Sequence, residues 1–301
     1  MDIDVKHNFD AKNLTSFKVS GIIENAYFPK SKEELIYLLE TLDNSMILGN
    51  CSNVLISSEG LRQDVIFTKN CNKIEFNNEK VYAECGLKIQ MASKLACEHC
   101  LGGFEFMIGF PASIGGAVFM NASAQGQAIS DYLLFAEVFD LNTKKVLNLS
   151  KDDLKFDYRK SICQDNNYIV LSAEFALPKS DKAEIQNKMN SNLEFRHNHQ
   201  PSLALPNCGS VFKNPQNDSA GRLLDKVGAK ELCVGGAKVW EHHANFIINY
   251  DHATSNDILN LMLLMYNKVD ENFGIKLSPE VIYIGDKSED EEKIWKILKQ
   301  K

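Results

Sequence analysis

Residues 101–126 read LGGFEFMIGFPASIGGAVFMNASAQG, a run in which phenylalanine, isoleucine and methionine lie between six glycines. Flexible linkers are polar, whereas this run is apolar between its glycines, so it predicts buried backbone that bends tightly. The small residues around Pro111, Ser113, Gly115 and Gly116 would leave backbone N–H groups free to face an anion such as a phosphate. A tightly packed turn in an ordinary core is the alternative, and the run alone favours a phosphate or dinucleotide loop only slightly.

The composition is that of an ordinary globular protein. The 301 residues are 44% hydrophobic and 24% charged, which suits two or three domains. The net charge of −7 disfavours a nucleic-acid partner. The longest apolar run, near residues 258–265, is far shorter than the ~20 residues of a membrane span. The first ten residues, MDIDVKHNFD, lack the apolar core of a signal peptide. We therefore expect a cytoplasmic protein that does not enter a membrane.

Neither the cysteines nor the histidines predict a metal site. The eight cysteines are expected to be reduced thiols in a cytosolic chain. The only CxxC motif, at residues 97–100, has no second ligand pair, so we expect it at the end of a helix that Gly102-Gly103 stops. Adjacent histidines on a strand, as the pair His242-His243 would be, point their side chains to opposite faces. One histidine is therefore expected in the core and the other on the surface.

Hydrophobic periodicity and capping residues predict the elements. In chain order they are a helix over 32–42, strands over 46–48, 54–56 and 65–67, a hairpin over 73–84 turning at Asn77-Asn78, a helix over 88–100, strands over 135–139, 145–147 and 168–171, a polar helix over 181–195, a helix over 220–227, strands over 237–240 and 245–249, a long helix from Thr254 or Ser255 to Gly274, a strand over 281–284, and a charged tail over 287–301 that forms a helix and frays. Alternation of helix and strand predicts an α/β unit up to about residue 70. The polar helix and the prolines that follow it predict a domain boundary near 195–200.

Residues 207–215, NCGSVFKNP, are the second informative stretch. Gly209 lets the backbone bend before Ser210, and Lys213 and Asn214 place a cation and an amide within a few residues. Donors of this kind suit an anionic ligand. The alternative, an ordinary turn serine at Ser210, is by frequency the more common one.

Two further short stretches carry charged side chains in apolar surroundings. In FDYRKS, residues 156–161, Arg159 follows a tyrosine, and a surface salt bridge to Asp157 or Asp152 is the alternative to a functional role. In LSPEVI, residues 277–282, Glu280 stands at the start of a strand, where a carboxylate either caps a turn or faces a cleft.

Taken together and in order, these stretches resemble the UDP-N-acetylenolpyruvoylglucosamine reductase family, the UDP-N-acetylmuramate dehydrogenases of peptidoglycan precursor synthesis. The motifs that carry the resemblance are LTSFKVSG (14–21), LGNCSNVLI (48–56), GFEFMIGFPASIGGAVFMNASAQG (103–126), DYRKSI (157–162), PNCGSVFKNP (206–215), AGRLLDKVGAK (220–230), GGAKVWEHHANFIIN (235–249) and LSPEVIYIG (277–285). They span nearly the whole chain, and their order is more specific than any one of them.

The resemblance implies an α+β fold of the FAD-binding, vanillyl-alcohol oxidase (PCMH) type. Residues 1–70 and 71–197 would be the two subdomains that hold FAD, and residues 198–301 the substrate-binding domain. The positions that match the family's FAD segments, with backbone amides facing the pyrophosphate, are Gly49, Asn50, Cys51, Ser52, Asn53, Gly109, Pro111, Ala112, Ser113, Gly115, Gly116 and Asn121.

The implied activity is the NADPH-dependent reduction of the enolpyruvyl double bond of UDP-N-acetylglucosamine enolpyruvate to UDP-N-acetylmuramate. NADPH reduces the flavin, and hydride then passes from the flavin N5 to the substrate. Ser210 would supply the proton, and Arg159 and Glu280 would stabilise the enol or enolate, because fixed donors aimed at developing charge lower the barrier. The matching substrate-binding positions are Lys213, Asn214, His243 and Asn245. The expected enzyme is a monomer without metal.

The spacing of two of these residues indicates a form of the enzyme. Only 51 positions separate Arg159 from Ser210, which resembles the shorter, second type without a substrate-binding tyrosine loop. Another group must then close over the diphosphate.

The chain departs from the family pattern at several positions. Cys51, Ala112 and Ser123 stand where glycine is usual, Gln125 where an aromatic residue is usual, and Trp240 where serine is usual, and no tryptophan follows Gly86-Leu87. A β-carbon would cost about 1–2 kcal/mol at any of the usual glycine positions that needs positive φ.

Two other functions stay open. One is an FAD oxidase that uses oxygen, against which the 206–215 motif and Glu280 argue. The other is a flavin-free binding module for a sugar nucleotide, against which the three intact catalytic positions argue.

Overall fold

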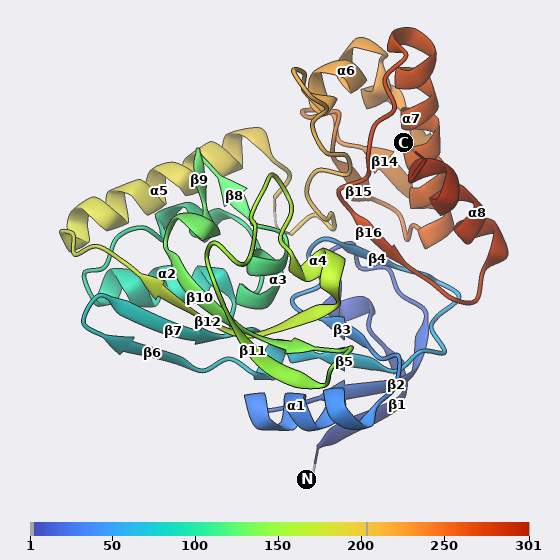
Figure 1. Ribbon diagram of the computed structural model, residues 1–301. Coiled ribbons are helices and arrows are strands. Elements are labelled where there is room, and N and C mark those ends of the chain that lie inside the picture. Colours follow the sequence, from blue (N-terminus) through green and yellow to red (C-terminus); the bar gives the residue numbers. More distant parts are fainter. Residues whose placement is uncertain (1–2, 203, 301) are drawn as a thin grey trace. The chain divides into compact units, whose positions relative to one another are not determined.

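The computed structural model describes residues 3–202 and 204–300, which form two units, each with its own hydrophobic core (Figure 1). Unit 1 comprises the described residues of Met1–Lys6, Ala26–Asn50 and Asp64–Arg196. Unit 2 comprises those of His7–Asn25, Cys51–Gln63 and His197–Lys301. The chain thus passes between the units several times. The three-part division at residues 70 and 197 stays a prediction.

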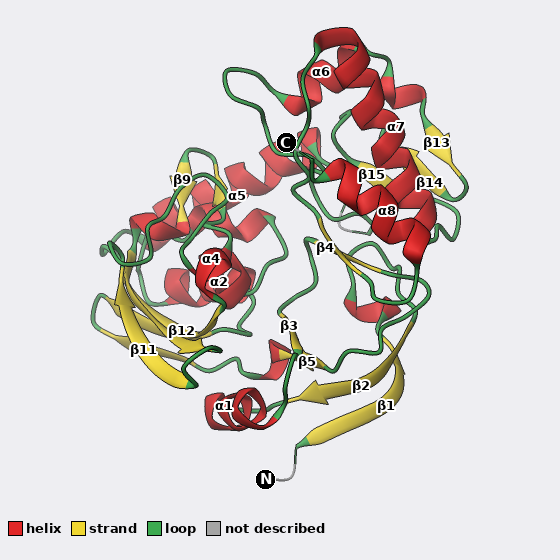
Figure 2. Ribbon diagram, turned by 45° about the vertical axis from the view of Figure 1, so that its right-hand side comes forward, coloured by secondary structure: helices red, strands yellow, loops and turns green. Residues whose placement is uncertain are grey.

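An antiparallel five-stranded sheet is the centre of unit 1 (Figure 2). Its strands, in spatial order, are β11 (Lys145–Ser150), β10 (Leu133–Asp140), β12 (Tyr168–Ala176), β7 (Lys80–Glu84) and β6 (Ile74–Asn77). The helices around it are α2 (Ile89–Glu98), α3 (Ile114–Phe119), the one-turn α4 (Cys163–Asn166) and α5 (Lys182–His199). Helix α3 packs on β12 and β7, so the glycine-rich segment that contains it is part of the core of this unit.

A second sheet joins β1 (Asp4–Asp10), β2 (Ile22–Phe28), β5 (Val65–Phe67) and β3 (Met46–Leu48) in that order. Strands β2 and β3 both pair in parallel with β5. Parallel neighbours need a crossover connection, and helix α1 (Lys32–Thr41) supplies it between β2 and β3. The side chain of Ser31 accepts a hydrogen bond from the N–H of Glu34, as the predicted helix start requires.

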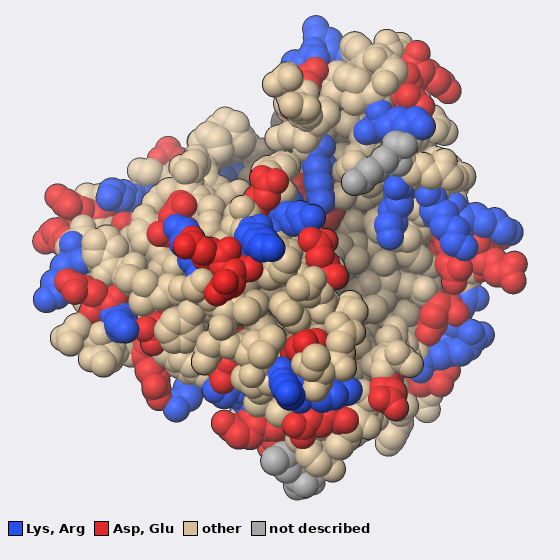
Figure 3. Space-filling view, viewed as in Figure 1, with Lys and Arg blue, Asp and Glu red and all other residues tan. Residues whose placement is uncertain are grey.

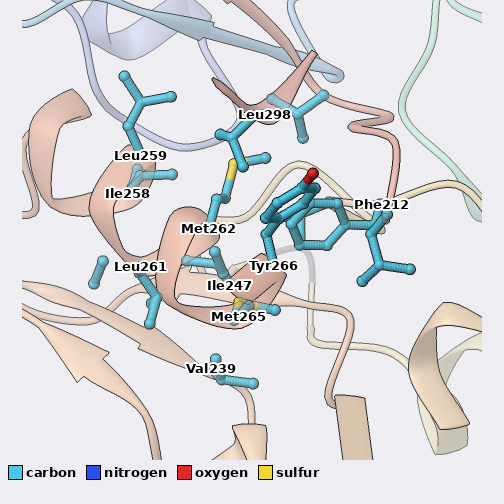
Figure 4. Close-up of a cluster of buried hydrophobic side chains, with 14 of the residues drawn as sticks. Phe212, Val239, Ile247, Ile258, Leu259, Leu261, Met262, Met265, Tyr266 and Leu298 are labelled. Atoms are coloured by element: carbon cyan, nitrogen blue, oxygen red, sulfur yellow. The ribbon is translucent and has the colours of Figure 1, made fainter. Parts of the chain in front are cut away.

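Helix α7 (Ser255–Phe273) organises unit 2. Thr254 caps it reciprocally with Asp257, and Gly274, at φ 63°, ends it. Its apolar face packs against residues from several other segments, among them Phe212 and Leu298 (Figure 4). The other elements of this unit are the parallel pair β4 (Val54–Ile56) and β16 (Ile282–Ile284), the antiparallel strands β13 (Cys233–Val234), β14 (Ala237–Val239) and β15 (Ile247–Asn249), and the helices α6 (Ala220–Lys226) and α8 (Glu289–Leu298).

Most predicted elements are present, but three local predictions were wrong. The hairpin turns at Asn78-Glu79, one residue later than predicted, because Asn77 pairs with Lys80. Helix α2 stops before the glycines, since Cys100 already adopts the left-handed conformation at φ 56°. The histidine pair lies in a turn before β15 rather than in a strand.

The carboxyl-terminal tail forms the predicted helix, α8, but this helix is packed and not fraying. Glu291 of α8 is 2% exposed. Its carboxylate accepts hydrogen bonds from the hydroxyl groups of Ser57 (2.6 Å), Tyr283 (2.7 Å) and Ser255. A buried carboxylate with three donors fixes the helix to three other segments of unit 2, and no local sequence signal reveals these long-range contacts.

The described residues contain no helix that is both long and apolar enough to span a bilayer. They also contain no group of three or more histidine, cysteine or acidic side chains that could hold a metal ion. On the face in Figure 3, basic and acidic side chains are interspersed, so that face carries no extended area of a single sign.

Candidate active site

Ser210 lies on a short extended segment of unit 2, one side of which is held by Asn245. The N–H of Val211 donates to the carbonyl of Asn245 (2.9 Å), and Ser210 bridges Phe246 in antiparallel fashion. The buried side chain of Asn245 accepts from the N–H of Phe212 (3.0 Å) and donates to its carbonyl (2.8 Å). The structure therefore uses Asn245, a predicted substrate-binding residue, to hold the serine segment.

The other side of the segment is held by the residues around Glu280. The N–H of Glu280 donates to the carbonyl of Val211 (2.9 Å), and the N–H of Lys213 donates to that of Ser278 (2.8 Å). The side-chain amide of Asn53 donates to the carbonyl of Glu280 (2.9 Å). The fold thus places the predicted proton donor and the predicted carboxylate on neighbouring segments of unit 2, and their backbones are fixed.

The predicted functional side chains of this segment make fewer hydrogen bonds within the protein than its backbone does. Ser210 and Lys213 are half-buried. In the described residues the hydroxyl of Ser210 makes no hydrogen bond and the ammonium of Lys213 no ion pair. Burial, and then the charge of Glu280, raises the pKa of the Cys208 thiol.

The two remaining predicted substrate residues of unit 2 have defined partners. The side-chain oxygen of Asn214 accepts from the N–H of Ala220 at the start of α6 (3.1 Å). The Nδ1 of His243 accepts from the N–H of Asn245 (3.2 Å), so the neutral ring carries its proton on Nε2. Burial lowers the pKa of His243, which is half-buried, whereas His242 is exposed.

In unit 1, the first turn of α3 does not offer free N–H groups. Ile114 and Gly115 donate to backbone carbonyls within residues 85–87 (2.8 Å each), and Gly116 donates weakly to the hydroxyl of Ser113 (3.4 Å). The expectation that this turn faces an anion was therefore wrong at these amides. The turn is instead tied to the loop before α2, which explains why a β-carbon at Gly115 would lie only 2.8 Å from that of Cys85.

The glycine-rich segment does contact the second predicted cofactor segment. The side-chain amide of Asn50 donates to the carbonyl of Pro111 (2.8 Å). A β-carbon on Gly49 would lie 2.3 Å from the hydroxyl oxygen of Ser113. Gly49 is thus required by close packing, and the fold brings together two stretches that are about sixty residues apart in sequence.

Residues 51–53 have the local geometry of an anion-binding turn. Cys51 adopts φ 49°, and the N–H groups of the following Ser52 and Asn53 donate to no acceptor in the part of the chain that the structure describes. Successive amides beside a left-handed residue form a concavity that suits phosphate oxygens. Cys51 carries the left-handed cost of about 1–2 kcal/mol, whereas Ala112 and Ser123 do not adopt positive φ.

Arg159 belongs to unit 1 and sits in a strained turn at φ 54°. The N–H groups of Asp157 and Lys160 each donate to the carbonyl of the other (3.0 and 3.1 Å), which closes this turn. The guanidinium lies 5.1 Å from the ring of Tyr158, and its Nη1 donates to the hydroxyl of Ser123 (2.7 Å). In the sequence, Ser123 stood out only as a departure from the usual glycine. No local signal in the sequence predicts its contact with Arg159.

Asn121 links the same turn to the glycine-rich segment. Its side-chain amide donates to the carbonyl of Asp157 (3.1 Å). Its side-chain oxygen is buried and has no partner within residues 3–202 and 204–300. Asn121, a predicted cofactor residue, therefore has a clear positioning contact and one acceptor that is still unused.

Comparison with known proteins agrees with this arrangement. The family model described as UDP-N-acetylenolpyruvoylglucosamine reductase, C-terminal domain, matches residues 200–284. The reductase of that name from Caldicellulosiruptor bescii is 38% identical over 281 residues, 91% of this chain and 89% of the relative. That from Streptococcus thermophilus strain LMD-9 is 38% identical over 289 residues, 95% of this chain and 94% of the relative. The crystal structure of UDP-N-acetylenolpyruvylglucosamine reductase from Thermus caldophilus has a TM-score of 0.79 and 30% identity, and covers 95% of this chain and 100% of that one.

These likenesses establish the class of protein first: an oxidoreductase with the α+β fold predicted from the sequence. Because relatives that are 38% identical cover more than nine tenths of it, the chain belongs to the UDP-N-acetylenolpyruvoylglucosamine reductase family. The resemblance stated from the sequence motifs is confirmed.

Proposed function

We propose that the protein reduces the enolpyruvyl double bond of UDP-N-acetylglucosamine enolpyruvate, giving UDP-N-acetylmuramate for peptidoglycan synthesis, with FAD as cofactor and NADPH as electron donor. The single observation that carries the residue assignment is the hydroxyl of Ser210. It has no hydrogen-bond partner in the described chain, while the backbone beneath it is held from both sides and lies beside that of Glu280.

The local geometry fits the cofactor at one segment and not at another. The free amides of Ser52 and Asn53 suit the FAD pyrophosphate, whereas the first-turn amides of α3 are already used. The residues assigned to FAD are Gly49, Asn50, Cys51, Ser52, Asn53, Gly109, Pro111, Ala112, Ser113, Gly115, Gly116 and Asn121, of which Gly49 and Gly115 act by allowing close packing. When bound, FAD supplies the chemistry of accepting a hydride from NADPH and passing it to the substrate.

The chain's own groups deal with the charge and the proton. Hydride addition beside a carboxylate leaves an enol or enolate, which Arg159 would stabilise through its positive charge and Glu280 through a hydrogen bond from its carboxyl group. Donors fixed in advance lose little free energy in reorganising. Ser210 gives its proton to the carbon next to the carboxylate. Lys213 and Asn214 bind phosphate groups, and His243 and Asn245 support the substrate-binding segment. We further propose a cytoplasmic monomer in which residues 1–70 and 71–197 bind FAD and residues 198–301 bind the substrate.

The test separates the two half-reactions. Ser210→Ala should bind flavin and be bleached by NADPH at the normal rate, whereas reoxidation by the enolpyruvyl nucleotide should fall on the order of 10²–10⁴-fold. Stopped-flow absorbance measures both steps. Ser202→Ala, which removes an exposed hydroxyl from the same unit, is the matched control and should behave as the parent.

Two outcomes would contradict the proposal. Near-normal reoxidation in Ser210→Ala would remove the serine from its role. Rapid oxygen consumption with NADPH alone, without any reoxidation by the enolpyruvyl nucleotide, would identify an oxidase instead.

A further inference from the structure

Arg159 is fixed at its backbone, but its charged end lies several rotatable bonds away. The turn at residues 157–160 closes on itself, and the side-chain amide of Gln164 donates to the carbonyl of Arg159 (3.0 Å). These bonds set the Cα position and leave the side-chain torsions to be fixed by other contacts. A long cation that must face a developing anion therefore needs an anchor near its tip.

Ser123 provides such an anchor from a rigid position. It lies in the two-residue strand β8 (Ser123–Ala124), which pairs with β9 (Gln127–Ala128) in register Ser123 to Ala128. Its hydroxyl accepts from Nη1 of Arg159 at 2.7 Å, and both side chains are partly buried. Two residues earlier, Asn121 holds the carbonyl of Asp157 (3.1 Å), so one short segment fixes both the turn and the guanidinium.

The chemical nature of the anchor matters. A carboxylate in this place would orient the guanidinium but also bring a negative charge beside it, whereas a hydroxyl orients it without adding a charge. The hydroxyl of Ser123 therefore gives the side chain of Arg159 an orienting contact.

We propose that Ser123 is a positioning residue that holds the guanidinium of Arg159 in the orientation that stabilises the anionic intermediate. The inference rests on the proposed function, because it takes the role of Arg159 from there. It predicts a defect confined to the step in which negative charge develops on the substrate.

The first test uses the flavin-loaded enzyme and follows the two half-reactions by stopped flow. Ser123→Ala should lower the rate of reoxidation by the enolpyruvyl nucleotide on the order of 10-fold and leave flavin reduction by NADPH unchanged. Ser123→Thr keeps the hydroxyl and should restore the rate to within about twofold of the parent. In an Arg159→Lys background, Ser123→Ala should add little, because the two residues act as one unit.

The second test does not depend on turnover. With ¹⁵N-labelled arginine, the Nη protons of Arg159 should give a resolved signal at low temperature, identified by its loss in Arg159→Lys. Ser123→Ala should broaden that signal by freeing rotation, and Ser123→Thr should keep it. If Ser123→Ala leaves both the signal and the reoxidation rate unchanged, the inference is overturned. A parent enzyme that fails to react with the nucleotide but shows the hindered signal would overturn the proposed reaction and keep the positioning contact.

Discussion

The glycine-rich segment of unit 1 and the serine segment of unit 2 are both bonded tightly at the backbone, but they differ in what they leave unpaired. In the first, the amides of Ile114, Gly115 and Gly116 all donate within the protein. In the second, the backbone is equally occupied while the side chains of Ser210 and Lys213 have no partner in the described chain. A motif rich in glycine can thus act as scaffold, and we place the proposed chemistry where polar side chains stand unpaired on a fixed backbone.

The largest expected effect tests whether the side chain of Glu280 acts in the reaction while its backbone acts in folding. Glu280→Gln keeps the N–H bond to Val211 and the carbonyl that accepts from Asn53, so folding should be unchanged. The loss of the carboxyl group, which the proposed reaction uses at the enol or enolate, should lower the rate of reoxidation by the enolpyruvyl nucleotide on the order of 10²–10³-fold. Circular dichroism melting and stopped flow measure the two properties. A Glu280→Gln variant with a much lower melting temperature and the parent's reoxidation rate would show that this side chain acts in folding and not in the reaction.

A smaller effect, on stability, tests the scaffold role of unit 1. In Gly115→Ala, the new β-carbon meets that of Cys85 at 2.8 Å and the Cys85 carbonyl oxygen at 3.2 Å, so overpacking should cost about 1–3 kcal/mol of unfolding free energy. Gly116→Ala is the matched control. Its β-carbon meets only the Ser113 hydroxyl at 3.4 Å, and alanine is favoured in a helix by about 1 kcal/mol. Equal unfolding free energies of the two variants, measured by urea unfolding, would show that α3 is not packed as described.

The sequence predicted local features better than distant ones. Ser31, Thr254 and Gly274 mark helix ends through bonds within one turn, so their capping roles could be read directly. Cys100 ends α2 although glycines follow, because the chain turns before it reaches them. The burial of Glu291 depends on three segments that only the fold brings together.

The same limit applies to the candidate site. The motif order was specific enough to give the family and to name Ser210 and Glu280, which the fold places on paired segments. The contact between Ser123 and Arg159 joins positions 36 residues apart, and no periodicity or spacing rule predicts it. Sequence patterns also do not show whether an amide is free, which is why the first turn of α3 was misjudged.

The smallest expected effect uses the adjacent histidines of unit 2 as a matched pair. Burial lowers the pKa of His243 in the folded state, Lys230 lowers it further, and Asp225 opposes this. The unfolded chain then binds the proton more readily, so this histidine stabilises the fold fully above its ordinary pKa of about 6.5 and loses that contribution as the pH falls below it. Between pH 7.5 and 5.5, His243→Gln should therefore weaken the pH dependence of urea unfolding, while His242→Gln, at an exposed position, should leave it as in the parent. Identical slopes for the two variants would mean that the ring of His243 is as open to water as its neighbour, and that it does not pack against Gly221 of α6.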